Sequence, residues 1–164
     1  LFGNKINNNI ADNIAVNYRR HYSQTGLYKV KLYDGIKKML HTFDKKYTLY
    51  IVSSKPKDFI AKLTPKLEIE SFFKGIYGPG LELSPTDKGN LIAELRSEIG
   101  CGATECIMIG DKAEDVIAAK QNDIKAIGIT YGYGTLTELK EAKADIIVDT
   151  PEGIITSINQ IESI

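Results

Sequence analysis

The feature that most limits the fold is a regular alternation of short apolar runs and helical patterns from Thr48 to the end of the chain. The runs with the length and side chains of strands are residues 48–54, 75–78, 105–110, 125–130 and 145–149. The helical patterns are residues 56–67, 85–100, 112–122, 136–143 and 151–162, with Pro56 in a first turn and Gly100 at a helix end. Strands that alternate with helices at this spacing predict an α/β fold with βαβ units and a parallel sheet.

The chain before Thr48 has a different character. Helical patterns at residues 10–26 and 34–46 flank an irregular stretch, and no convincing strand occurs there. We therefore predict two parts: a partial helical cap and connector over residues 1–34, and an α/β core over residues 35–164.

The composition excludes several classes of partner. Lysine and arginine together number 21, as do aspartate and glutamate, so no overall charge favours nucleic acid or a membrane surface. No apolar stretch is long enough to span a bilayer, and the sequence from Leu1 lacks the pattern of a secretion signal. Cys106 begins an apolar run, which suits a buried thiol better than a crosslink to Cys101. We expect a cytoplasmic protein that binds neither nucleic acid nor membrane; nothing in the sequence indicates its oligomeric state.

Polar side chains follow two of the predicted strands, and ligands of parallel sheets bind at the carboxyl ends of strands. Asp111 and Asp115 come after the third strand, and Ser53, Ser54 and Lys55 come after the first. The turn at residues 131–134 follows the fourth strand, where it either shapes the mouth of a site or is an ordinary connection to the next helix.

Most of these residues also have a simpler interpretation. Asp111 can be a helix N-cap with Glu114 completing a capping box, Asp115 can favour the positive end of the helix dipole, and Ser54 can be a cap. Lys88 is harder to explain in this way, because a cation in the first turn of a helix opposes the dipole. A nearby anion would offset that penalty.

Taken together, the residues suit phosphate chemistry. Two carboxylates at a strand end offer oxygen ligands for Mg²⁺, and a serine hydroxyl, backbone N–H groups and a lysine suit a phosphoryl group. A catalytic triad with histidine is not indicated, since His21 and His41 both lie in the front section, and no Walker A sequence occurs.

From about Tyr18 to its end the chain resembles the haloacid dehalogenase superfamily, in its phosphoglycolate phosphatase-like branch. The segments that carry the resemblance are, in order, YRRHYSQTGLYKVKLYDGI, VSSKP, DKGNLIAEL, IMIGDKAEDVIAAKQN, IGITYGYGTLTEL and ADIIVDTPEGI. The resemblance implies a Rossmann-like parallel core with a helical cap.

The resemblance also implies roles for individual residues. Ser53 would hydrogen-bond the phosphoryl oxygen, Lys88 would stabilise its charge, and Asp111 and Asp115 would hold Mg²⁺. Ser54 and Lys55 are candidates for substrate contact, and Arg19 and Arg20 are weaker ones, for which a solvated helix face is the simpler interpretation. The implied activity is Mg²⁺-dependent hydrolysis of a small phosphorylated metabolite through an aspartyl-phosphate.

One motif of the family is absent. The first superfamily motif, Asp-x-Asp-Gly-Thr, supplies the nucleophile, and neither LYDGI at Leu32 nor DTP at Asp149 replaces it. Its strand lies, in the family, between the strands predicted at Thr48 and Glu105, so two inner strand edges are expected to be exposed. We therefore expect this chain to be part of a longer protein or to receive that strand from another chain. The alternatives are a domain that binds phosphate and metal without catalysis, or a mutase or nucleotidase on the same scaffold.

Overall fold

The structure is a computed structural model that describes residues 29–80 and 87–162. In this part of the chain the strands are β1 (Leu49–Val52), β2 (Phe73–Tyr77), β3 (Ile107–Gly110), β4 (Lys125–Ile129) and β5 (Ile146–Val148). The α-helices are α2 (Ile36–Phe43), α3 (Lys57–Lys66), α4 (Lys88–Ile99), α5 (Ala113–Gln121), α6 (Leu136–Glu141) and α7 (Pro151–Glu162), and the 3₁₀ turns are η2 (Glu70–Phe72) and η3 (Ala103–Glu105).

The predicted order of strands and helices from Thr48 onward is confirmed, with small shifts at the boundaries. Pro56 is the N-cap of α3 and not a residue of its first turn. Glu105 lies in η3, so β3 begins two residues later than predicted. Gly100 ends α4 with a φ of 66°, a left-handed conformation that glycine adopts without strain. The predicted helix at residues 10–26, together with Arg19 and Arg20, lies outside the described residues.

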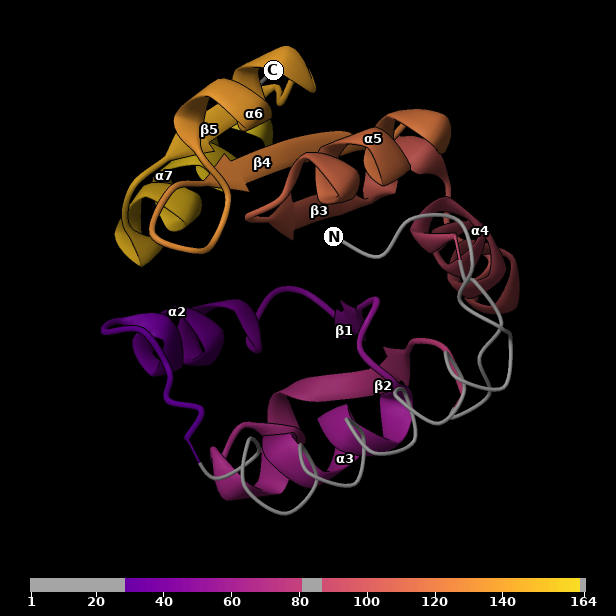
Figure 1. Cartoon of the computed structure of the whole chain (residues 1–164), viewed down its shortest axis with the longest axis vertical. Coiled ribbons are helices and arrows are strands. Elements are labelled where there is room, and N and C mark those ends of the chain that lie inside the picture. Colours follow the sequence, from indigo (N-terminus) through magenta and orange to yellow (C-terminus); the bar gives the residue numbers. More distant parts are fainter. Residues whose placement is uncertain (1–28, 81–86, 163–164) are drawn as a thin grey trace, which may run out of the picture.

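The strands form two parallel sheets, one with the order β1-β2 and the other with the order β3-β4-β5. In Figure 1, β1 and β3 are the edges of the two sheets that lie toward each other. Within the described residues no strand pairs with either of these edges, as expected from the absent first motif. All residues of β1 and β3 are only half-buried, whereas β4, which has a partner on each side, has three fully buried residues.

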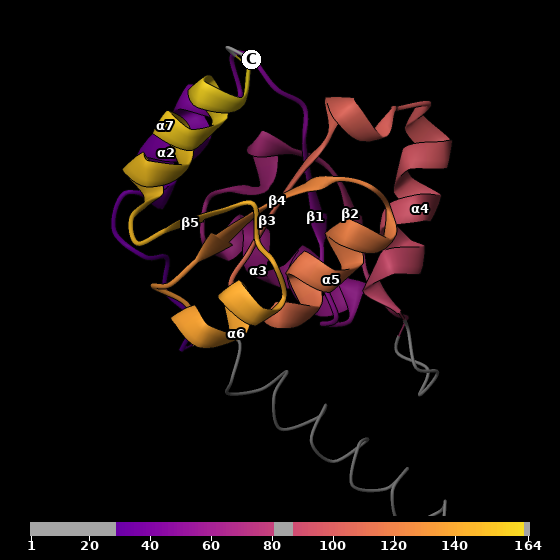
Figure 2. The ribbon, with the colours of Figure 1, turned by 90° about the horizontal axis from the view of Figure 1, so that it is seen from above.

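Helices cover the two faces of the larger sheet, and the side chains of β3 alternate between them. Ile107 and Ile109 pack in a cluster with α2 and α7, while Met108 packs on the other face in a cluster with α4, α5 and α6. Figure 2 shows α2 and α7 side by side, with α5 and α6 on the opposite side of the strands. The period of two is the one expected for a sheet with both faces buried.

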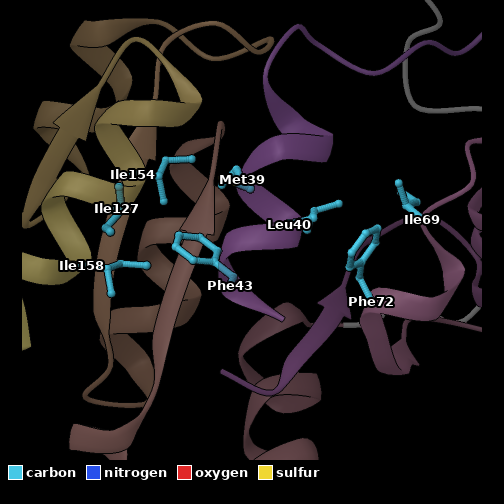
Figure 3. Close-up of a cluster of buried hydrophobic side chains, with 8 residues drawn as sticks. All are labelled: Met39, Leu40, Phe43, Ile69, Phe72, Ile127, Ile154 and Ile158. Carbon is cyan, nitrogen blue, oxygen red and sulfur yellow. The ribbon is translucent and has the colours of Figure 1, made fainter. Parts of the chain in front are cut away.

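Helix α2 joins the two sheets, β1-β2 and β3-β4-β5, which are called the two half-sheets below, through its buried face. Met39 and Phe43 point toward the α7 side of the larger sheet, and Leu40 points toward η2 beside the smaller sheet (Figure 3). The apolar side chains that meet here are Met39, Leu40, Phe43, Ile69, Phe72, Ile127, Ile154 and Ile158. The helix predicted at residues 34–46 thus packs at the centre of the core.

Candidate functional site

The connection between β3 and α5 holds the two predicted metal ligands. Asp115 is buried in the first turn of α5, with 5% of its surface exposed, and its Oδ2 accepts the backbone N–H of Lys112 at 3.0 Å. Gly110 lies so close to this carboxylate that a Cβ there would overlap it. The simpler interpretation of Asp111 as N-cap with Glu114 at N3 is wrong, because Lys112 is the N-cap and Asp115 is the N3 residue.

Lys88 is the first residue of α4, and its Nζ donates a hydrogen bond to Oδ1 of Asp115. The side chains of Lys88 and Asp115 are only 14% and 7% exposed, so water screens their attraction little. Asp115 is thus the nearby anion that the position of Lys88 in a first helical turn predicts. Asp87 caps α4 by accepting the Asn90 N–H at 3.1 Å.

Asp111 follows β3 directly and is enclosed by the turn after β4. Its Oδ2 accepts the backbone N–H of Tyr133 at 2.6 Å. A Cβ on Gly132 or on Gly134 would overlap atoms of Asp111, so both positions need glycine for this close approach. The turn after β4 therefore lies directly against Asp111, and its part in the mouth of a site stays a prediction. The sequence places glycines on either side of Tyr133, but it does not show that they approach Asp111.

Tyr131 adds a buried hydroxyl beside this carboxylate. Burial, followed by the charge of Asp111, raises the pKa of Tyr131 to about 12. Its hydroxyl oxygen has no hydrogen-bond partner in the part of the chain that the structure describes. The ring meets that of Tyr33 edge-on, with centroids 5.3 Å apart, so the connector before α2 reaches this edge of the sheet.

The carboxyl end of β1 carries the other predicted residues. Ser53 Oγ accepts the backbone N–H of Lys55 at 3.1 Å, and Ser53 N–H donates to the Tyr77 carbonyl at 2.9 Å. Ser54 is exposed and does not cap α3, whose N-cap is Pro56. A Cβ on Gly78 would come within 2.8 Å of the Lys55 carbonyl, so the residue that follows β2 lies directly against this turn.

The predicted residues therefore form two groups. Lys88, Asp111 and Asp115 gather at the end of β3, whereas Ser53, Ser54 and Lys55 lie at the end of β1, in the other sheet. Helix α4 contacts both β1 and α5, so the helix that begins with Lys88 packs against both parts of the structure.

The carboxylates have the donor chemistry that Mg²⁺ needs. Oδ1 of Asp111 accepts no hydrogen bond from any described residue, and Asp115 lies in the same connection. No group of three or more histidine, cysteine, aspartate or glutamate side chains that could hold a metal occurs among the described residues. Mg²⁺ needs only one or two protein carboxylates, since waters and phosphate oxygens complete its shell, so the pair fits this ion.

Comparisons with known proteins identify the relatives of this fold. The profile described as haloacid dehalogenase-like hydrolase matches residues 2–129. A 5′-nucleotidase from Pseudomonas aeruginosa is 38% identical over 128 residues, which are 77% of this chain and 58% of that protein. A phosphoglycolate phosphatase from Vibrio vulnificus is 28% identical over 152 residues, 88% of this chain and 66% of that protein. The chain thus spans less than two thirds of the length of these relatives.

Solved structures agree with the sequence relatives. A predicted phosphatase from Clostridium acetobutylicum superposes with a TM-score of 0.83 at 31% identity, covering 87% of this chain and 67% of that one. A haloacid dehalogenase-like hydrolase from Streptococcus pneumoniae gives a TM-score of 0.85 at 26% identity, covering 94% of this chain and 72% of that one.

No helix in the described ranges has the length and apolar character needed to cross a membrane.

Proposed function

The chain belongs to the haloacid dehalogenase-like hydrolases, and from that premise we propose that it forms most of a Mg²⁺-dependent phosphatase for small phosphate monoesters. The observation that carries the proposal is the Lys88–Asp115 pair beside Asp111 at the carboxyl end of β3. A cation and two carboxylates at one strand end suit a site that receives both a metal ion and a phosphoryl group.

Each residue has a defined task in this proposal. Asp111 and Asp115 would hold Mg²⁺, which when bound neutralises charge on the phosphoryl oxygens. Lys88, oriented by Asp115, would add a second positive charge to the same group. Ser53 would donate its hydroxyl proton to a phosphoryl oxygen while its oxygen accepts the Lys55 N–H. Ser54 and Lys55 are the proposed substrate contacts at this end of β1.

The nucleophile would come from a strand outside the described residues. A parallel strand between β1 and β3 would pair with both unpaired edges and would end between Ser53 and Asp111. An aspartate at that end would attack phosphorus and displace the alcohol of the monoester, and water would then hydrolyse the aspartyl-phosphate to the free carboxylate and phosphate. The half-buried residues of β1 and β3 support this placement, because a strand between them would cover both.

The test uses the intact protein from its natural source, with its mass and N-terminal sequence determined first. Phosphate release from p-nitrophenyl phosphate is measured with Mg²⁺ and after its removal by EDTA. We expect activity that EDTA abolishes, that Asp111→Asn reduces to background and that Asp123→Asn leaves intact, since Asp123 is an exposed residue of the turn after α5. Undiminished activity of Asp111→Asn would contradict the metal assignment.

Two candidate substrate classes follow from the names of the relatives. The nucleotidase is the more similar in sequence, and the phosphoglycolate phosphatase matches more of the chain. A comparison of kcat/KM for phosphoglycolate and for 5′-nucleoside monophosphates decides between them. If the intact protein releases no phosphate from any of them but binds Mg²⁺ through Asp111, it is instead a non-catalytic binding domain.

A further inference from the structure

The only two cysteines of the sequence lie together where α4 connects to β3. Cys101 follows Gly100, the last residue of the α4 cap, and Cys106 directly precedes β3. Their Sγ atoms are 3.1 Å apart, and both thiols are reduced and half-buried. The sequence favoured a buried thiol at Cys106 over a crosslink to Cys101, and the structure shows both thiols free and in contact with each other.

The connection that carries the two thiols is held in place by several hydrogen bonds. Gly102 N–H donates to Glu105 Oε2 at 2.7 Å, and Cys106 N–H donates to the Ala103 carbonyl at 3.3 Å. Arg96 donates from Nε to the Cys101 carbonyl at 3.3 Å. Because the backbone already holds the sulfurs in contact, closure to a disulfide, in which the sulfurs are about 2.05 Å apart, needs a movement of only about 1 Å.

Burial withdraws the thiol of Cys106 from water. Burial, followed by the hydrogen bond with Cys101, raises the pKa of Cys106 to about 11. Thiolates are the attacking species in disulfide exchange, so Cys106 is a poor initial nucleophile. Reaction with an external disulfide therefore begins at Cys101, and Cys106 serves as the second thiol.

We propose that Cys101 and Cys106 form a reversible intramolecular disulfide, with a low-molecular-weight disulfide such as oxidised glutathione as the oxidant. The thiolate of Cys101 attacks one sulfur of the oxidant and releases one glutathione thiolate. The sulfur of Cys106 then displaces the second glutathione, and the two released thiolates take up the two protons from the protein thiols. Two protein thiols are oxidised to one disulfide, and one external disulfide is reduced to two thiols.

The bond would join the C-terminal end of α4 to the start of β3. Cys106 and Asp111 lie at opposite ends of β3, roughly 16 Å apart for five residues of extended chain. We therefore expect the disulfide to restrain opening of this connection without blocking the proposed phosphate site. This inference does not depend on the proposed function, since its measurement follows the thiols alone.

The experiment incubates the intact folded protein with excess oxidised glutathione, denatures it, alkylates remaining thiols with N-ethylmaleimide and measures the intact mass. We expect the loss of two hydrogen atoms with no maleimide attached, full reversal by dithiothreitol and a monomeric band on a non-reducing gel. If the natural protein contains further cysteines outside this sequence, tryptic mapping assigns the bond to the single peptide of residues 97–112, which contains both Cys101 and Cys106.

Cys101→Ser is the matched control, because serine keeps a small polar side chain at a half-buried position. In this variant we expect Cys106 to be recovered with maleimide or with one glutathione, never as an internal disulfide. Recovery of both thiols of the unmodified protein with maleimide, stable glutathione adducts on both, or a disulfide-linked dimer would each overturn the proposal.

Discussion

Replacing Lys88 by methionine tests the buried ion pair at the centre of the candidate site. Methionine keeps most of the length of the side chain and removes the charge, so the largely buried carboxyl group of Asp115 loses its charged partner. We expect a large loss of stability, even in the absence of any substrate or metal.

The magnitude follows from the burial of the pair. Removal of one partner from a buried ion pair typically costs about 3–5 kcal/mol, because the remaining charge is uncompensated. The Lys112 N–H still donates to Asp115, which favours the lower end of this range. A loss of about 3 kcal/mol is a large part of the roughly 5–15 kcal/mol that stabilises an ordinary domain.

Lys120→Met is the matched control. Lys120 also pairs with an aspartate, Asp145, at 2.6 Å, but the two side chains are 39% and 35% exposed. Exposed pairs contribute about 0.2–1 kcal/mol, so the same substitution should cost several times less at this position.

The assay is urea unfolding followed by circular dichroism at neutral pH, with equal slopes required before midpoints are compared. Lys88→Met is also measured in an Asp115→Asn background, where removal of the lysine leaves no buried carboxylate without a partner. We expect its cost there to fall to about 1 kcal/mol or less. Equal losses for the two lysines, or an unchanged loss in the Asp115→Asn background, would refute the reasoning.

Three further predictions concern the surroundings of the site and the larger sheet. Tyr131→Phe should leave the free energy of unfolding unchanged or raise it by up to about 1 kcal/mol, because the hydroxyl that it removes is buried without a partner among the described residues. Gly134→Ala should lower that free energy by about 1–3 kcal/mol, since its Cβ would overlap the carbonyl of Asp111; both effects are measured by urea unfolding. At Asp145 burial acts to raise the pKa, but hydrogen bonds from its lysine partner and from the Ala126 N–H outweigh it and leave the pKa lowered. A carboxyl group whose pKa is lower in the folded state than in the unfolded state stabilises the fold at pH values above its unfolded pKa. Unfolding curves across pH should therefore show Asp145→Asn less stable than the natural protein near pH 6, with a deficit that shrinks below about pH 3.9.

The strand and helix pattern was predictable because it depends on local periodicity. Each apolar run from Thr48 onward is bounded by polar or glycine-containing turns, and no tertiary contact was needed to recognise it. The partner of Lys88 was predictable in kind for a similar reason, since a cation at a helix start requires an anion close by. That this partner is Asp115 depends on a contact between residues 27 positions apart, which only the structure shows.

The features that the sequence did not predict depend on single-residue registers or on long-range packing. Assigning Asp111 as the cap placed the start of α5 one residue too early, and that shift exchanged the roles of Glu114 and Asp115. The approach of Gly132 and Gly134 to Asp111 joins two different connections of the sheet, and no local pattern specifies it. The contact between the two thiols likewise depends on η3, a 3₁₀ turn that was expected to be strand at Glu105.

The separation of the two half-sheets determines how the site is held together. Ser53 and Asp111 lie in different sheets, so no strand pairing between described residues fixes their relative position. Their placement depends instead on α2, whose buried face meets both halves of the core, and on α4, which contacts β1 and α5. TM-scores of 0.83 and 0.85 over 87% and 94% of the chain show that both halves superpose together on single solved structures. In the proposed function, the additional strand would therefore enter a frame that helix packing already holds, between the proposed phosphate contacts at the end of β1 and the proposed metal ligands at the end of β3.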